Sequence, residues 1–539
     1  MNYLYWRPFF NANNQTLFYI GQYAYAFSAT TAIWLVGGLE QPLVAASLAW
    51  AVYFLLKDQQ SFERQQLIVS SSLMYASLAL GVLCLTRPDS PIICVCLALA
   101  IILHNGLTTK QFFRCCVLAI FPVIFVLSQL LFRLHYYGEW VAMPALIKVH
   151  PNLSSVKLGL LYIAAGLLFL GPFSYYCFRL LFCGVHTQQR FLYLLVFTTT
   201  IIWLIYLTVI GGDIFPAFRH FTQISVLLTL LFPAIEKLTQ QQSKNSKLFS
   251  PPWLIAMSII YIIVQWANPS TSIARGHLWV WDGEVIANAM KQGFSDKKPL
   301  IAVDAAGALP YWTEYPALDM LGLNDSHIAH SKPSQKSQFL GHQFGDGHYV
   351  YQRQPDIINF AFAHGIFEPF YKSGKELWKM DKFHQNYIPV RLSGTSPYFI
   401  EGVQWLYKWS NKVGITQSQQ QLTIPAYFFS LQADFDNRTV KSKNIQRVHD
   451  FPIPNHLIRS YIGENNEWQI NIEKGQTIYL SQPSHTIIEI AKTKVVFIPN
   501  SANISIEWQY NSQGQQVLAL TSEQDLSLAL ESIILMTTD

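Results

Sequence analysis

The chain has 539 residues, of which 51% are hydrophobic and 13% are charged, and its mean hydropathy is +0.22. This composition is too apolar for an ordinary soluble protein, and the length is too great for a single domain. The net charge of +5 is small and forms no basic tract, which argues against nucleic acid as a partner.

The apolar residues are concentrated in the first half of the chain. From residue 17 to residue 268, apolar runs alternate with short polar breaks, whereas residues 270–539 have the composition of a water-soluble protein. We therefore predict a multispanning membrane domain over residues 1–268, a soluble α/β domain over 270–395, and a β-rich, sandwich-like domain over 396–539.

Nine apolar runs are candidate membrane-spanning helices, because a helix of about 20 apolar residues crosses a bilayer. They lie at residues 17–36, 40–57, 66–85, 91–105, 113–132, 156–176, 191–210, 217–235 and 252–268. With the N-terminus inside, Lys and Arg are more frequent in the inner segments than in the outer ones, as the positive-inside rule requires. This orientation places the loops 37–40, 135–140 and 211–220 on the outer face, together with the soluble half.

The outer loop GGDIFPAFRH, residues 211–220, carries charged residues between two predicted spans. If the next helix begins within this loop, Arg219 and His220 lie in its first turn, and Gln223 shares a face with Arg219. A cation beside the positive end of a helix calls for a nearby anion. Either Asp213 pairs with Arg219, or an anionic ligand such as a phosphate binds there; an ordinary turn whose charges reach lipid headgroups is the alternative.

Two further acidic residues are predicted on the same face. Glu40 begins a span, and Glu139 lies beside Tyr137 in an aromatic-rich loop. Charged groups at or just inside the membrane are costly and often functional, although each one alone fits a solvated helix end or an aromatic belt. The convergence of Glu40 and Glu139 with Asp213 predicts a site.

The soluble half is predicted to begin as an α/β domain. A helix and three strands are expected at residues 281–292, 299–312, 317–325 and 355–362. Asp304 and Asp325 follow or end these strands, where carboxylates bind sugars or a metal ion, or serve in turns and caps. After residue 396, short alternating runs indicate a small β-sandwich, and the chain has no GxSxG, P-loop or HExxH motif.

Several motifs taken together resemble one bacterial family. They are GGLE, YYGEW followed by Pro144 and Lys148, GGDIFPAFR, ARGHLWVWDG, VDAAGALPYW, ALDMLGLND and GHQFGDGHYV. This set resembles the LphB-like bacterial polytopic membrane proteins, which are similar to mycobacterial terminal arabinofuranosyltransferases and, more distantly, to GT-C glycosyltransferases. The resemblance covers most of residues 28–390.

The resemblance implies an enzyme of the bacterial inner membrane, in contact with membrane lipid. It would move a sugar from a polyprenyl-phosphate donor to a polysaccharide or glycolipid acceptor of the cell envelope, on the outer, periplasmic face. Asp213, Glu40 or Glu139 would deprotonate the acceptor, while Arg219 and His220 would hold the departing phosphate. The cofactor requirement is left open, including a divalent metal.

The resemblance starts after the first elements of the family, which include an acidic Asp-Asp-Ala-Phe segment. We therefore expect N-terminal spans to be missing, either because the gene begins upstream of Met1 or because the protein has lost its base. In the second case the chain would be a non-catalytic glycan-binding membrane protein. A transporter or flippase is a third alternative, which the lack of visible repeated hydropathy halves disfavours.

Overall fold

A computed structural model describes the chain from residue 15 to residue 537. The longer segments outside the described residues are 149–152, 172–189, 232–250, 332–341, 432–467, 482–492, 498–503 and 511–515, with breaks of one to three residues elsewhere. The chain divides into two compact units. We call Met1–Ala142 with Val149–His277 the helical unit, and Met143–Lys148 with Leu278–Asp539 the C-terminal unit.

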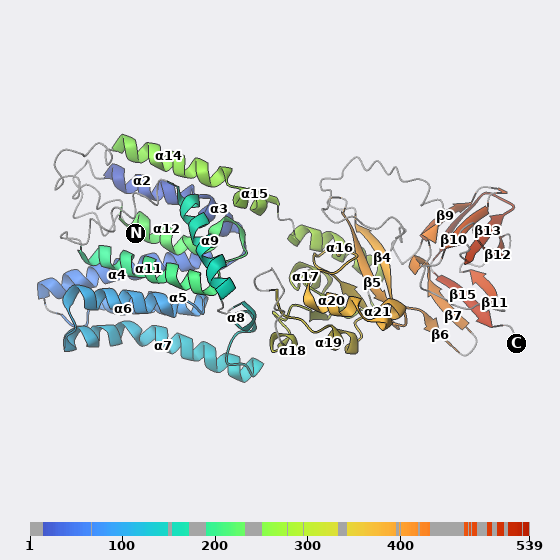
Figure 1. The fold of residues 1–539 in the computed structure, drawn as a ribbon, viewed down its shortest axis with the longest axis horizontal. Coiled ribbons are helices and arrows are strands. Elements are labelled where there is room, and N and C mark those ends of the chain that lie inside the picture. Colours follow the sequence, from blue (N-terminus) through green and yellow to red (C-terminus); the bar gives the residue numbers. More distant parts are fainter. Residues whose placement is uncertain are drawn as a thin grey trace. The chain divides into compact units, whose positions relative to one another are not determined.

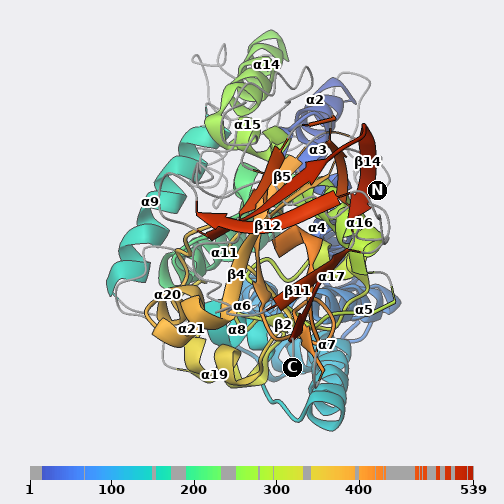
Figure 2. The ribbon, with the colours of Figure 1, turned by 90° about the vertical axis from the view of Figure 1, so that its right-hand side faces the viewer.

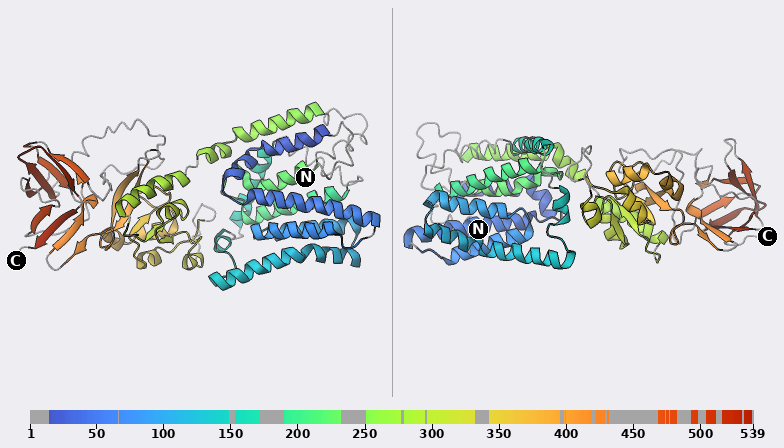
Figure 3. Two further views of the ribbon diagram at one scale, coloured as in Figure 1. Left: turned by 180° about the vertical axis from the view of Figure 1, so that it is seen from behind. Right: turned by 60° about the horizontal axis from the view of Figure 1, so that its bottom comes forward.

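The helical unit is built from long helices, of which α4, α5, α6 and α7 lie side by side (Figures 1 and 3). Its elements are α2 (Gln15–Ala26), α3 (Ala29–Val36), α4 (Gln41–Gln65), α5 (Ser71–Thr86), α6 (Pro91–Asn105), α7 (Thr109–Tyr137), α9 (Leu153–Leu170), α11 (Arg190–Ile210), η3 (Pro216–Phe221), α12 (Thr222–Thr229), α14 (Pro251–Ala267) and α15 (Pro269–Gly276).

Three of these helices, α7, α9 and α11, are long and apolar enough to cross a bilayer. The pair α3 and α4 forms a fourth candidate, although the two helices meet at an angle of 118°. The helices α5, α6 and α14 are apolar but shorter. The predicted helical, apolar N-terminal half is therefore confirmed, whereas helix length alone does not establish nine spans.

Polar residues set where several of these helices begin. The predicted span 17–36 is two helices, because Ser28 caps α3 by accepting the N–H of Thr31 at 3.2 Å. Ser70 and Thr108 cap α5 and α7 in the same way. Each cap satisfies one of the backbone donors that a helix start leaves unpaired.

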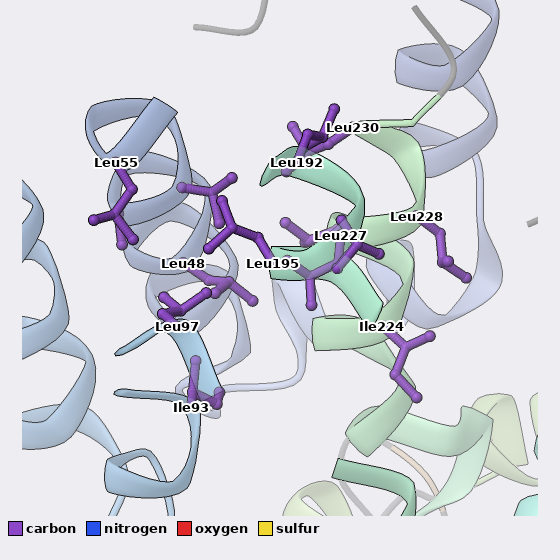
Figure 4. Packing of buried hydrophobic residues seen from close by; sticks show 14 of the residues in the cluster. Leu48, Leu55, Ile93, Leu97, Leu192, Leu195, Ile224, Leu227, Leu228 and Leu230 are labelled. Atoms are coloured by element: carbon purple, nitrogen blue, oxygen red, sulfur yellow. The ribbon is translucent and has the colours of Figure 1, made fainter. Parts of the chain in front are cut away.

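The helical unit has an apolar core that includes the helices around the candidate site. Leu48 of α4, Leu97 of α6, Leu195 of α11 and Leu227 of α12 are fully or almost fully buried, and Figure 4 shows them gathered in one interior region. In a bilayer, packing of this kind is favoured by close van der Waals contact rather than by removal from water. The fit between these side chains therefore holds α4, α11 and α12 together.

The C-terminal unit begins with a mixed sheet. Its elements up to residue 407 are α8 (Met143–Lys148), α16 (Trp279–Phe294), β1 (Ile301–Val303), α17 (Ala308–Thr313), β2 (Ala317–Asp319), α18 (Ser326–Ala329), α19 (Gly347–Gln352), β3 (Ile357–Asn359), α20 (Lys372–Trp378), α21 (Asp381–Asn386), β4 (Tyr387–Gly394) and β5 (Ile400–Tyr407). The strand order is β2-β1-β3-β5-β4. The first three strands are parallel, and β5 is antiparallel to both of its neighbours.

The helix and the three strands predicted for the α/β region are present as α16, β1, β2 and β3. The strands belong to the mixed sheet. It also continues past residue 395, where the sequence placed a domain boundary. The strands β4 and β5 pair along their whole length, from Tyr387 opposite Tyr407 to Gly394 opposite Ile400. This pairing crosses the expected boundary, so the mixed sheet extends to Tyr407, the last residue of β5.

The remaining strands form small antiparallel sheets, as the alternating sequence predicts; β11 and β12 belong to separate sheets (Figure 2). The strand orders are β12-β13-β10-β8, β11-β15-β7-β6 and β14-β9. Their bounds are β6 (Thr416–Gln417), β7 (Gln421–Pro425), β8 (Ser430–Leu431), β9 (Trp468–Ile472), β10 (Thr477–Ser481), β11 (Thr493–Phe497), β12 (Ile504–Tyr510), β13 (Gln516–Ser522), β14 (Leu526–Leu530) and β15 (Ser532–Thr537), with a short 3-10 helix, η6 (Ala426–Phe428), after β7.

Candidate functional site

The chain turns sharply after α11 at two glycines. Gly211 and Gly212 have φ angles of 91° and 84°, a region of backbone conformation that favours glycine. A Cβ atom on Gly212 would lie 2.5 Å from Cγ of Tyr162 in α9. The close approach of α9 therefore restricts this position to glycine and determines where the following loop begins.

The residues after the turn do not form the first turn of an α-helix, which corrects the prediction from sequence. Pro216–Phe221 is the short 3-10 helix η3, in which Ala217 and Phe218 have positive φ angles of 55° and 48°. Such conformations cost about 1–3 kcal/mol per non-glycine residue and concentrate at functional sites. Arg219 and His220 consequently precede α12.

Four side chains from three helices hold the backbone of η3 in this conformation. Thr30 and Trp34 of α3 donate hydrogen bonds to successive carbonyl oxygens of η3, at 2.8 and 3.2 Å. Trp203 of α11 donates to a third carbonyl oxygen at 2.9 Å, and Ser270 of α15 accepts a backbone N–H at 2.7 Å. These bonds offset the conformational cost of the loop.

Asp213 and Arg219 form a buried ion pair inside this loop. Nε of Arg219 donates to Oδ2 of Asp213 at 2.5 Å, and Nη2 donates to Oδ1 at 3.3 Å. The guanidinium also lies 4.1 Å from the ring centroid of Phe215, a favourable cation–π contact. Pairing of Asp213 with Arg219, one of the two arrangements predicted from sequence, is therefore present.

A second guanidinium, that of Arg87 between α5 and α6, connects this loop with Glu40. Nη1 of Arg87 donates to Oε1 of Glu40 at 2.6 Å, while Nε and Nη2 donate to the two oxygens of Asp89 at 2.8 and 2.7 Å. Nη2 also lies 3.5 Å from Nδ1 of His220, whose Nε2 is 3.7 Å from Oδ2 of Asp213. We call Glu40, Arg87, Asp89, Asp213, Arg219 and His220 the ion cluster.

The carboxylates of the ion cluster differ in how accessible they are. The side chains of Asp89 and Asp213 are 9% and 7% exposed, and guanidinium groups bind both oxygens of each. Burial raises the pKa of Asp89, but the hydrogen bond and charge of Arg87 outweigh it and leave the pKa below its ordinary value. Glu40 is 27% exposed, and among the described residues only its Oε1 is hydrogen-bonded. Glu40 is therefore best placed to accept a proton from a substrate.

A cavity of about 310 Å³ lies among α2, α3, α4 and α12 in the helical unit. Its wall includes Gln41, which follows Glu40, and Trp34, whose ring lies 5.8 Å from the guanidinium of Arg219. Most of the wall consists of Ala, Leu, Val, Pro, Tyr and Thr side chains. Oε1 of Gln41 and Oγ1 of Thr222 are buried and have no hydrogen-bond partner in the described part of the chain. The cavity can therefore hold a largely apolar group.

Three other predicted site residues lie outside the ion cluster. Gln223 is buried in α12 and its amide makes no hydrogen bond to a described residue. Gln223 lies in the first turn of α12, whereas Arg219 lies in the preceding η3. Tyr137 is exposed at the end of α7 and Glu139 follows it in the next loop. Of the three predicted carboxylates, Glu40 and Asp213 take part in the hydrogen bonds described above for the ion cluster.

The two candidate carboxylates of the C-terminal unit are engaged in backbone contacts. Asp325 caps α18 by accepting the N–H of Ile328 at 2.9 Å, and it also accepts the hydroxyl of Tyr349 at 3.0 Å. Asp304 follows β1, is 2% exposed and accepts the N–H of Ala361 at 2.8 Å. Burial raises the pKa of Asp304 to about 7. The cap alternative thus accounts for Asp325, and Asp304 is not accessible to a sugar.

The described residues include no group of three or more His, Cys, Asp or Glu side chains that could hold a metal ion. The ion cluster is consistent with this, because its carboxylates face guanidinium groups instead of one another. No residue is therefore assigned to the divalent metal that the resemblance left open.

Sequence reasoning missed three contributors to this site, namely Arg87, Asp89 and Tyr206. The hydroxyl of Tyr206 in α11 donates to Oδ2 of Asp89 at 3.2 Å. A signal was available for the first two, because Arg87-Pro-Asp89 is a charged break between two apolar runs on the predicted face of Glu40. Tyr206 lies inside an apolar run and carried no such signal.

Comparison with known proteins adds a match for one part of the chain. A family model described as a domain of unknown function, DUF8728, matches residues 276–408, which correspond to α16 through β5 and thus to the mixed sheet. No curated protein and no solved structure matches the chain.

Proposed function

We propose that this chain is a membrane glycosyltransferase that moves a sugar from a polyprenyl-phosphate donor to a cell-envelope glycan. The observation that carries the proposal is the pairing of Glu40 with Arg87 inside the ion cluster. A partly exposed carboxylate then lies beside the guanidinium of Arg87, so that a general base and a phosphate-binding group occur within one hydrogen-bonded network.

In the proposed reaction, the phosphate of the donor binds Arg87 and displaces Glu40 from it. The freed carboxylate of Glu40 takes the proton of the acceptor hydroxyl, whose oxygen attacks the anomeric carbon of the sugar. The bond between that carbon and the phosphate oxygen breaks, and polyprenyl phosphate leaves with the charge held by Arg87. Asp89, which binds two nitrogen atoms of Arg87, keeps the guanidinium in position.

The cavity beside Gln41 supports a lipid-linked donor. Its mainly apolar wall suits part of a polyprenyl chain, and Gln41 directly follows Glu40. The proposal also includes nine spans, an outer-face site and the bacterial inner membrane. These rest on the distribution of Lys and Arg between the predicted loops and on the family resemblance.

A non-catalytic, glycan-binding membrane protein is the second candidate. The observation that favours it is that the carboxylates of the ion cluster already face guanidinium groups of the same cluster. Such a network can hold helices together without catalysing a reaction, since charges inside a membrane protein pair with one another.

The test is mass spectrometry of envelope glycans and lipid-linked sugars from cells that lack the gene. The cells are complemented with wild type, Glu40→Gln, Glu139→Gln, or the control Glu63→Gln, which alters a side chain near the other end of α4 that is 56% exposed. We expect the deletion to lose a sugar from the glycan and to accumulate its lipid-linked donor. Wild type, Glu139→Gln and Glu63→Gln should restore the glycan, whereas Glu40→Gln should not.

Full restoration by Glu40→Gln would remove Glu40 as the base. Loss of restoration by Glu139→Gln alone would transfer that role to Glu139. An unchanged glycan in the deletion strain would rule out the transferase and leave the glycan-binding candidate.

A further inference from the structure

The C-terminal unit contains an open pocket of about 620 Å³ that no part of the proposed reaction uses. Its wall comes from α18, α19, α20 and the segments beside them. The side chains on which the following argument depends are His327, His330, Asp346, His348, Lys372 and Glu376. We call this the polar pocket.

The polar pocket lies at the carboxyl end of the parallel strands. Ser373 of α20 donates a hydrogen bond to the carbonyl oxygen of Met320, the residue after β2, at 2.7 Å. The same hydroxyl accepts the N–H of Asp346 at 3.1 Å. In open α/β sheets, ligands bind outside the carboxyl ends of the strands, where the chain leaves one strand for neighbours on opposite sides. The chain leaves β1 for β2 on one side and leaves β3 for β4 on the other, so the direction of the connections reverses between the neighbouring strands β1 and β3.

The wall of the polar pocket is held by contacts between α19 and α20. Gly347 donates its N–H to Oε2 of Glu376 at 2.8 Å. A Cβ atom on Gly347 would lie 2.6 Å from the carbonyl oxygen of Ser373, so the two helices approach as closely as glycine allows. Nζ of Lys372 lies 3.3 Å from Glu376 and also donates to the carbonyl of Gly345. The polar groups are therefore in place before a ligand arrives.

The chemistry of the wall favours a ligand with hydroxyl groups. Nε2 of His327 lies 2.9 Å from Asp346, and its ring stacks on Tyr349 with the centroids 4.0 Å apart. Carboxylates accept hydrogen bonds, whereas Lys372 donates them, and a hydroxyl group can do both. An anion would meet Asp346 and Glu376, whose side chains are 29% and 32% exposed, and a purely apolar ligand would leave these charges without water.

We propose that the polar pocket binds a neutral saccharide. The proposal stands on the C-terminal unit alone, and it holds whether or not the helical unit transfers sugar. It adds a glycan-recognition site within the region that matches the domain of unknown function.

The test uses the full chain in lipid nanodiscs, probed with an array of neutral and acidic bacterial envelope saccharides and, separately, with inorganic phosphate. We expect binding of at least one neutral saccharide, and at least tenfold weaker binding by Asp346→Asn and Glu376→Gln. The control Glu368→Gln changes an exposed carboxylate outside the wall and should bind as wild type does. Because His348 is an exposed residue of the wall, His348→Ala should weaken binding without unfolding the domain.

Three outcomes would overturn the proposal. They are no binding of any neutral saccharide, binding of phosphate or acidic saccharides only, and neutral binding that is unchanged in His348→Ala and in folded Asp346→Asn and Glu376→Gln protein. Thermal unfolding of each variant shows whether a loss of binding reflects a loss of structure.

Discussion

Nη1 of Arg87 lies 2.6 Å from Oε1 of Glu40, although 47 positions separate the two residues in the chain. The same guanidinium binds Asp89 through two nitrogen atoms. A charge that loses its buried partner typically costs about 3–5 kcal/mol. We therefore expect Arg87→Met to lower the thermal unfolding temperature of the purified protein clearly, and Arg87→Lys to lower it less, because Lys keeps the charge but loses the bidentate geometry. An unchanged unfolding temperature in Arg87→Met would show that Arg87 does not stabilise the cluster.

Thr30→Val tests whether η3 is held by its neighbours. Thr30 is 2% exposed and donates to the carbonyl oxygen of Ala217 at 2.8 Å, and valine has nearly the same shape. The unpaired carbonyl should lower stability by about 1–3 kcal/mol, measured by denaturant unfolding in nanodiscs. The control is Thr208→Val, since the hydroxyl of Thr208 donates within its own helix, to the carbonyl oxygen of Leu204 at 3.0 Å. Equal effects of the two substitutions would argue against a specific role for Thr30.

A second ion pair, Asp58 with Arg114, has no exposed surface and lies near the other end of α4. Nη2 of Arg114 donates to Oδ2 of Asp58 at 2.5 Å, and Ser70 donates to Oδ1 at 2.5 Å. Asp58→Leu or Arg114→Leu alone should lower stability by about 3–5 kcal/mol, whereas the double variant should recover much of that loss, because no charge is left unpaired. Thermal unfolding of all four proteins gives the coupling. Additive losses would contradict a direct pair.

The pKa of Asp304, raised to about 7 by burial, predicts how stability depends on pH. Because the folded state holds this proton more tightly than the unfolded state, whose pKa is about 3.9, the contribution of Asp304 to stability should be greatest at low pH and should fall as pH rises from about 4 to 7, by up to roughly 4 kcal/mol. Asp304→Asn should remove this part of the pH dependence. Unfolding temperatures of both proteins from pH 4 to pH 8 check this, and parallel curves would contradict it.

The predictions of helices and strands from sequence succeeded where one local pattern decides the structure. The run at 91–105 coincides with α6, and the expected strands at 299–312, 317–325 and 355–362 contain β1, β2 and β3. They failed at the loop before α12, because Ala217 and Phe218 adopt positive φ angles that neither residue prefers. Contacts from α3, α11 and α15 impose that conformation, and no local pattern encodes them.

By itself, the sequence determined which half of the chain forms apolar helices, and that glycines and charged residues stand in the breaks between them. These properties follow from the solvent that each segment can enter and from the backbone preferences of single residues. Only the tertiary structure decided that Arg87 joins Glu40 to the loop of Asp213 and Arg219. The physical reason is that an ion pair between distant residues forms only where the packing of the core brings their charged atoms close together. A hydrogen bond between such atoms requires a distance of about 3 Å.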